Sequence, residues 1–309
     1  MTFLGNGEYV IGSHDQGVQV WRVEDGKEMA ALEAREVTCL AVSKDGNWIA
    51  AGTQRGVVAW DAKTYERKHS WDSSGTVCGV DFSPDSTRLV ASSRATIVNL
   101  ATGEQVLALD DHEDLVVAAK YSPRGDRIAT ATRNHVRLWD SNNGRLLTDI
   151  PVHVTQWSRG LVWFDNHVFV VSYNAIKKVE GSTVSEWPVP ETQPTSSIAI
   201  SNHGEFIAYS TRTRRTITFW DMLTRTPRAP IQHPKRVYSI ALSPDDQFLA
   251  ITGEGGKITI KRLSHIMVSI KFCFWVGFCY LLTRHTLRFR NQPSTLRMVY
   301  LILGGTINS

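Results

Sequence analysis

Short runs of apolar and β-branched residues, parted by turn-forming residues, recur along most of the chain. One stretch shows the pattern in full, with runs at Val116–Tyr121, Arg127–Thr132, Val136–Trp139 and Leu146–Ile150. Such runs are too short for typical helices and have the length and composition of β-strands. The pattern therefore predicts an all-β fold built from units of four antiparallel strands.

A turn of the type Ser-Pro-Asp-Gly marks each unit. Full copies begin at Ser83, Ser122 and Ser243, and weaker copies begin at Ser43 and Ser201. With Gly7 and Asn166 taken as degenerate copies, the fourth turn position falls at residues 7, 46, 86, 125, 166, 204 and 246. Seven copies at a period of about forty residues indicate a repeat protein.

A second marker follows each turn by roughly fifteen residues, where an apolar run ends in Trp or in a replacement for it. The seven positions are Trp21, Trp60, Val98, Trp139, Ile176, Trp220 and Lys261. At residues 60–61, 139–140 and 220–221 the pair is Trp-Asp. Because two independent markers agree on the register, the number of units is well defined.

These markers resemble those of the WD-repeat family, and in particular fungal WD-repeat proteins, over residues 1–263. The resemblance implies a seven-bladed β-propeller of four-stranded antiparallel blades, in which each sheet buries its faces against its neighbours around a common axis. The expected blades span about 1–32, 33–71, 72–110, 111–151, 152–190, 191–232 and 233–270. Residues 264–309 are expected to form a C-terminal tail.

The resemblance also implies a structural hydrogen-bond network in each blade, made by a His, a Ser or Thr, an Asp and the Trp. In the fourth blade the matching residues are His112, Thr132, Asn134 and Trp139, with Asn in the place of Asp. We expect these residues to stabilise the fold, because buried polar groups need hydrogen-bond partners. His153 and His233, at similar positions, are expected to be structural as well.

The repeat is degraded in two places. The fifth blade lacks the Ser-Pro turn and carries Trp157, Trp163 and Trp187 out of register, where they pack in the core or contribute to an interface. The first blade is truncated, because Met1–Leu4 supplies only the end of its first strand. The strand that usually interlocks the first and last blades is then missing, and His265–Ile270 would form the outer strand of blade seven. The chain is therefore expected to be a fragment, or a gene product lacking its first exon.

The tail contains an apolar segment of seventeen residues at 266–282, followed by Arg284, Arg288 and Arg290. This length is near the lower limit for a membrane-spanning helix, and the basic and aromatic flanks suit one. Two interpretations remain open: the segment is a membrane anchor, or residues 271–309 are poorly folded or translated intron sequence. Membrane association is expected only through this segment.

Charge and cysteine content narrow the function classes. Five of the 34 Lys and Arg residues lie in 265–309, which has no Asp or Glu, so residues 1–264 are close to neutral despite a net charge of +4 for the whole chain. Neutrality argues against nucleic-acid binding. The four cysteines have no metal-ligand spacing, and the N-terminus has no signal peptide, so a cytoplasmic location is expected.

The turns between the second and third strands of several blades carry arginine, and in a WD propeller these turns share one face. The residues are Arg55, Arg94, Arg133, Arg212, Arg214 and Arg215, with Lys177 and Lys178 nearby and acidic residues at Asp110–Asp114 on the same face. Guanidinium groups arranged around the channel mouth would suit bidentate binding of carboxylates or phosphates. The residues are candidates for binding an acidic or phosphorylated peptide.

No catalytic or metal-binding motif supports an enzyme. The chain has no Gly-x-Ser-x-Gly elbow and no His-Glu-x-x-His helix, and Gly253–Lys257 lacks the spacing of a phosphate-binding loop. We therefore expect a non-enzymatic scaffold for protein–protein interactions, without cofactors, that presents propeller loops to protein or peptide partners. The alternatives are a membrane-anchored sensor and a propeller enzyme.

Overall fold

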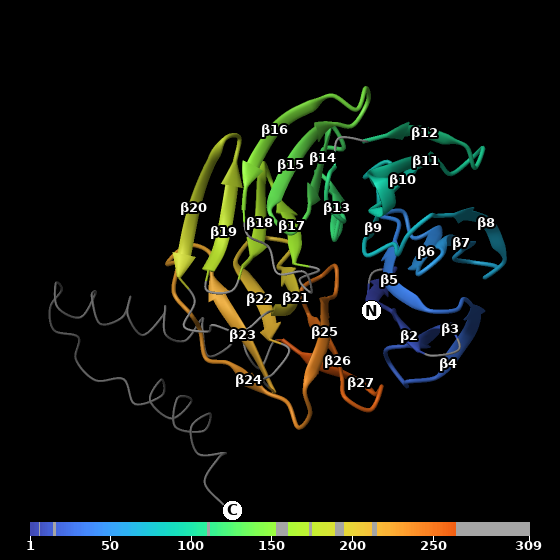
Figure 1. The fold of residues 1–309 in the computed structure, drawn as a ribbon. Coiled ribbons are helices and arrows are strands. Elements are labelled where there is room, and N and C mark those ends of the chain that lie inside the picture. Colours follow the sequence, from blue (N-terminus) through green and yellow to red (C-terminus); the bar gives the residue numbers. More distant parts are fainter. Residues whose placement is uncertain are drawn as a thin grey trace, which may run out of the picture. The chain divides into compact units, whose positions relative to one another are not determined.

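Seven antiparallel β-sheets surround a common axis in a computed structural model of the chain (Figure 1). The structure describes residues 1–5, 7–14, 17–109, 112–152, 160–172, 175–188, 195–211 and 215–263. Residues 1–263 form one structural unit. The predicted outer strand at 265–270 and the apolar segment 266–282 lie outside the described residues. The predicted seven-bladed β-propeller is confirmed.

Each blade is formed by strands that are consecutive in the chain. Blades one to three comprise β1 (Thr2–Leu4), β2 (Tyr9–His14), β3 (Gly17–Arg22) and β4 (Glu28–Glu33); β5 (Val37–Val42), β6 (Trp48–Thr53), β7 (Gly56–Asp61) and β8 (Arg67–Asp72); and β9 (Val80–Phe82), β10 (Arg88–Ala91), β11 (Thr96–Asn99) and β12 (Gln105–Ala108), with the short 3₁₀ turn η1 (Ser93–Ala95).

Blades four to seven follow the same order. They comprise β13 (Ala118–Tyr121), β14 (Arg127–Ala131), β15 (His135–Asp140) and β16 (Leu146–Pro151); β17 (Leu161–Phe164), β18 (His167–Val171), β19 (Ala175–Glu180) and β20 (Thr183–Pro188); β21 (Thr195–Ile200), β22 (Phe206–Thr211), β23 (Thr216–Asp221) and β24 (Ile231–Gln232); and β25 (Val237–Leu242), β26 (Phe248–Gly253) and β27 (Ile258–Arg262).

The Ser-Pro-Asp turns are closed by the serine side chain. The Ser83 hydroxyl donates to Asp85 Oδ1 at 2.5 Å and accepts the Arg88 amide proton at 2.9 Å, while Asp85 accepts the Thr87 amide at 3.1 Å. Short polar side chains that bond the nearby backbone favour such turns. The hydrogen bond from Ser83 holds the pKa of the Asp85 carboxyl below its usual value. The repeat marker is thus a hydrogen-bonded connection between the first two strands.

Replacement of Ser83 by alanine is expected to destabilise the protein by about 1 kcal/mol at pH 7, because Asp85 loses a hydrogen bond to its ionised form. A carboxyl whose pKa is lowered in the folded state contributes stability above the unfolded-state pKa, and this contribution is lost as the pH falls through the folded-state pKa. The free energy of unfolding, measured with urea, should therefore fall by less between pH 7 and pH 3 in Ser83→Ala than in the wild type. An equal loss in both proteins would contradict this assignment.

The repeat tryptophans pack against the preceding blade. Trp60 and Trp139 are each 2% exposed, and they pair with Ile49 and Ile128 on the neighbouring strand. Trp60 belongs to a cluster that includes Ile11, in blade one. Each tryptophan therefore fills the space between two blades, where its area contributes to stability.

The predicted tryptophan position of blade five is wrong. The register pairs Val168 with Val179, as it pairs Ile128 with Trp139 in blade four, so Val179 occupies the position that the sequence had assigned to Ile176. Ile176 packs instead with Trp187 against blade six. Trp187 is buried and lies in the core, while Trp157 lies outside the described residues.

Ring closure in the described part of the chain relies on side-chain packing. β1 has three residues, as does β9 of blade three, whereas β5 has six. Phe3 and Val10 of blade one pack with Ala250 of blade seven, and Trp21 and Phe248 cover this cluster. Within the described residues blade seven has three strands, and every sheet contains strands of one blade only.

Candidate partner-binding face

Arginines occupy corresponding turns in four blades. Arg55 follows β6, Arg94 follows β10, Arg133 follows β14 and Arg215 precedes β23, and all four side chains are exposed. We call the surface formed by these four residues the arginine face. Arg212 and Arg214, predicted to belong to it, lie outside the described residues. The repeat geometry brings the four described arginines to one side of the propeller.

The backbone around Arg94 is fixed by buried hydrogen bonds. Arg94 has φ 54° and ψ 19°, a left-handed conformation that costs an ordinary residue about 1–2 kcal/mol. The Ser92 hydroxyl accepts the amide protons of Cys78 at 2.8 Å and Gly79 at 3.0 Å, which ties this turn to the loop entering blade three. Arg94 therefore projects from a rigid turn, and strain of this kind is frequent at binding sites.

The other arginines keep their charges accessible. Arg55 approaches Glu36 at 3.8 Å, but its side chain is 89% exposed, so this ion pair contributes little. Arg94 and Arg133 make no ion pair with another described residue. Beside Arg133, the Asn134 side chain donates a hydrogen bond to Asp114 at 3.1 Å, so this carboxylate is held by an amide.

Two predicted neighbours do not belong to this face. Lys177 and Lys178 lie within β19, and they form ion pairs with Glu186 at 2.6 Å and with Glu180 at 3.3 Å. Their charges are thus engaged within blade five.

The arginine face lies outside the wall of the central channel. First strands of six blades line a central cavity of about 490 Å³, and the ion pair between Lys120 and Asp81 at 2.8 Å lies in its wall. The arginines follow second strands, so they stand one strand outward from the channel wall. The four arginines therefore form a wide circle around the channel and do not line its mouth directly.

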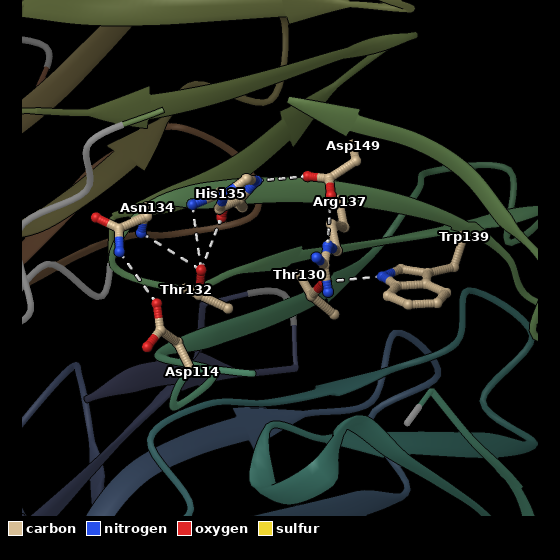
Figure 2. A network of polar contacts seen from close by, with 8 residues as sticks. All are labelled: Asp114, Thr130, Thr132, Asn134, His135, Arg137, Trp139 and Asp149. Carbon is tan, nitrogen blue, oxygen red and sulfur yellow. Dashed lines mark hydrogen bonds and ion pairs between the residues drawn. The ribbon is translucent and has the colours of Figure 1, made fainter. Parts of the chain in front are cut away.

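Figure 2 shows the polar network of blade four, which differs from the predicted one in its threonine. The Trp139 indole N–H donates to Thr130 Oγ1 at 2.8 Å. Thr132 lies two residues further on and accepts the His135 amide at 3.1 Å, which closes the turn that carries Arg133. His112 packs on Trp139 with ring centroids 5.1 Å apart. Of the predicted residues, Thr132 and Asn134 belong to the turn and His112 packs on Trp139, but Thr130 is the partner of the indole.

A second part of this network was not predicted. Asp149 of β16 bonds His135 Nδ1 at 2.7 Å and accepts from Arg137 Nε at 3.0 Å (Figure 2). Burial alone would raise the pKa of Asp149, but these two hydrogen bonds lower it below its usual value. The three side chains connect the outer two strands and brace the turn of Arg133. His233 is buried and its Nδ1 lies 2.8 Å from the Lys235 carbonyl oxygen, whereas His153 lies outside the described residues.

Comparisons with known proteins agree with this architecture. The family described as "WD domain, G-beta repeat" matches residues 26–61, 64–99, 103–140 and 226–260. Eukaryotic translation initiation factor 3 subunit I of Pyricularia oryzae is 22% identical over 215 residues, which cover 63% of each chain. WD repeat-containing protein 18 of Danio rerio is 26% identical over 174 residues, covering 48% of this chain and 39% of the relative. The chain thus spans less than two thirds of the length of these relatives.

Solved structures show the same fold. The Cps50 (Swd1) β-propeller domain of Myceliophteria thermophila aligns with a TM-score of 0.73 and 17% identity over 84% of this chain and 94% of that domain. A chain of a mitotic checkpoint complex aligns with a TM-score of 0.74 and 18% identity, over 84% of this chain and 85% of its own length.

Seven radial sheets that present loops on two faces define a β-propeller. The chain belongs to the WD-repeat β-propeller family, whose members generally act as protein-interaction scaffolds without catalytic activity. Within the described residues, no helix has the length and apolar character needed to cross a membrane.

Proposed function

We propose that this protein is an interaction scaffold whose arginine face binds an acidic or phosphorylated peptide of a protein partner. The observation that carries the proposal is the recurrence of exposed arginines in corresponding turns of four blades. Guanidinium groups form bidentate, charge-assisted hydrogen bonds with carboxylates and phosphates. Partners with negative charges would be attracted by the electrostatic field of the arginine face before contact.

Rigid presentation supports the same proposal. The turn of Arg94 is tied by Ser92, and the turn of Arg133 is closed by Thr132 and braced by Asp149. A side chain held on a rigid turn loses less conformational freedom on binding. The resemblance to a subunit of an initiation factor supports protein partners in general, without naming one for this chain.

Charge reversal at Arg94 and Arg133 together is expected to weaken the binding of acidic peptides at least a hundredfold, since a hydrogen bond to a charged group contributes about 1.5–3 kcal/mol. Fluorescence anisotropy with labelled peptides of the sequence Gly-Glu-Glu-X-Ser-Gly, where X is Leu, Phe, Ala or Lys, and with phosphoserine in place of the serine, measures this effect. The wild-type affinity should also fall as the salt concentration rises.

The matched control reverses two charges elsewhere. Lys63 and Arg145 lie in turns that join third and fourth strands, on the opposite side of the propeller, and both are exposed. Lys63→Glu with Arg145→Glu changes the net charge by the same amount and should leave peptide affinity within a factor of about three, because these charges lie far beyond the Debye length of about 10 Å at 0.1 M salt. Equal affinities of Arg94→Glu/Arg133→Glu and the wild type would refute the proposed function.

A further inference from the structure

Blade three lacks the tryptophan that fills the repeat position in blades one, two, four and six. Its second and third strands pair Leu89 with Val98, in the same register that pairs Ile128 with Trp139 in blade four. Two residues after Ile128 stands Thr130, which accepts the hydrogen bond of the indole, and two residues after Leu89 stands Ala91. Blade three thus has neither the indole nor the threonine hydroxyl that form this hydrogen bond in blade four.

The missing indole leaves space between blades two and three. Because Trp60 and Trp139 pack against the preceding blade, Val98 faces blade two, and it belongs to a cluster with Val57 and Val77. A cavity of about 530 Å³ lies at this position. Its apolar lining is provided by Val57, Trp71, Val77, Leu89, Ala91 and Val98. Valine in place of tryptophan therefore coincides with a cavity that has an apolar wall and is large enough for a side chain.

Trp71 forms a wall of this cavity and is fixed in place. The indole N–H of Trp71 donates to the Gly103 carbonyl oxygen at 2.7 Å, and its ring stacks on His69 with centroids 5.2 Å apart. His69 in turn contacts the Leu100 carbonyl oxygen at 2.7 Å through Nε2. The outer strand of blade two is thus hydrogen-bonded to the turn between the third and fourth strands of blade three. These contacts hold Trp71 away from the space beside Val98.

The rim of the cavity carries charges of both signs. Arg94, a member of the arginine face, lines it together with Ser93 and Thr96 on the side of blade three, and Asp72 lines it on the side of blade two. Both Arg94 and Asp72 are exposed. A peptide would therefore place an acidic residue over blade three and a neutral or basic residue over blade two.

We propose that the cavity between blades two and three receives an apolar side chain of the acidic peptide bound by the arginine face, next to a carboxylate held by Arg94. The proposal rests on the proposed function and adds to it the sequence preference of the ligand. Acidic residues give the rim its charge complementarity, whereas the apolar residue removes hydrocarbon surface from water in a pocket that is already formed. A leucine or phenylalanine fits the chemistry of this lining.

The test restores the tryptophan that the repeat pattern lacks. Val98→Trp places an indole where Trp60 and Trp139 have theirs and fills the cavity from inside the protein. The binding measurement uses the peptides Gly-Glu-Glu-X-Ser-Gly with Leu, Phe, Ala or Lys at X. The wild type should bind the Leu or Phe peptide at least tenfold more tightly than the Ala peptide, and Val98→Trp should lose this preference while it retains its affinity for the Ala peptide.

Two further variants keep the test decisive. Val98→Ile adds one methylene, leaves most of the cavity open and should keep the preference of the wild type. Ala91→Leu fills the cavity from the second strand, and it replaces Val98→Trp if thermal unfolding shows that the tryptophan variant does not fold. Folding of each variant is checked by circular dichroism and by its melting temperature before binding is measured.

The outcomes separate this inference from the proposed function. Equal affinity of the wild type for all four peptides, or a preference that survives in the folded cavity-filling variant, whether Val98→Trp or Ala91→Leu, overturns the pocket even if Arg94→Glu/Arg133→Glu abolishes binding. If the charge-reversal variant binds as the wild type does, the proposed function fails, and the pocket fails with it. A cavity that merely reflects loose packing would give the first of these results.

Discussion

Replacement of Trp139 by alanine is expected to lower the free energy of unfolding by about 3–5 kcal/mol, the range observed when buried aromatic side chains are truncated. Trp139 is 2% exposed and packs on blade three, so its loss opens a cavity between two blades. It also leaves Thr130 without the indole donor. Urea unfolding followed by circular dichroism measures the change.

A conservative variant separates packing from hydrogen bonding at this position. Thr130→Val removes the acceptor hydroxyl but keeps the shape of the side chain, and it is expected to cost about 1–2 kcal/mol because the buried indole N–H loses its partner. If Trp139→Ala were no more destabilising than Thr130→Val, inter-blade packing by the tryptophan would not be a main source of stability.

Replacement of Gly56 by alanine is expected to cost about 3 kcal/mol, since overpacking costs 1–3 kcal/mol and an unfavourable backbone conformation adds about 1 kcal/mol. Gly56 has φ +156°, and a Cβ atom there would lie 2.0 Å from the Trp71 carbonyl oxygen. That oxygen belongs to β8, which pairs with β7 at this point, so it cannot move away without loss of strand pairing. The melting temperature of Gly56→Ala should fall accordingly.

Gly75 provides the matched control for this substitution. It lies in the loop that leaves the same blade, and a Cβ atom there would have no atom within 4 Å. Gly75→Ala should change stability by no more than about 1 kcal/mol, because a glycine with room for a side chain gains slightly from reduced chain entropy. Similar losses in Gly56→Ala and Gly75→Ala would mean that the contact with Trp71 is not the cause.

The fold could be predicted from sequence because its markers are local. The hydroxyl of Ser83 closes a turn with Asp85 within two residues, and Trp60 and Trp139 each stand next to last in a strand at a fixed distance from such a turn. Both signals depend only on nearby residues, so they persist in the amino-acid pattern. Blade five lost both, and with no tryptophan the run Ala175–Glu180 does not indicate that Val179, rather than Ile176, takes its place.

The candidate site was predicted less completely, because its details depend on strand pairing. The choice between Thr130 and Thr132 as the partner of Trp139 follows from the register of β14 and β15, which the sequence does not state. The cavity beside Val98 was not predicted at all. The sequence shows that tryptophan is missing there, but only the positions of Trp71 and its neighbours decide whether the space is filled.

The composition of each sheet from consecutive strands has a consequence for the order of folding. In the described part of the chain no hydrogen-bond ladder joins one blade to another, so each blade can form its own ladders from contacts close in sequence, which favours rapid formation. Closure of the circle then remains as the late event, when Phe3 and Val10 meet Ala250. Until that moment the apolar surfaces of β1 and β25 are exposed to other chains, so the junction of the first and last blades is the point at which this protein would be most prone to aggregate.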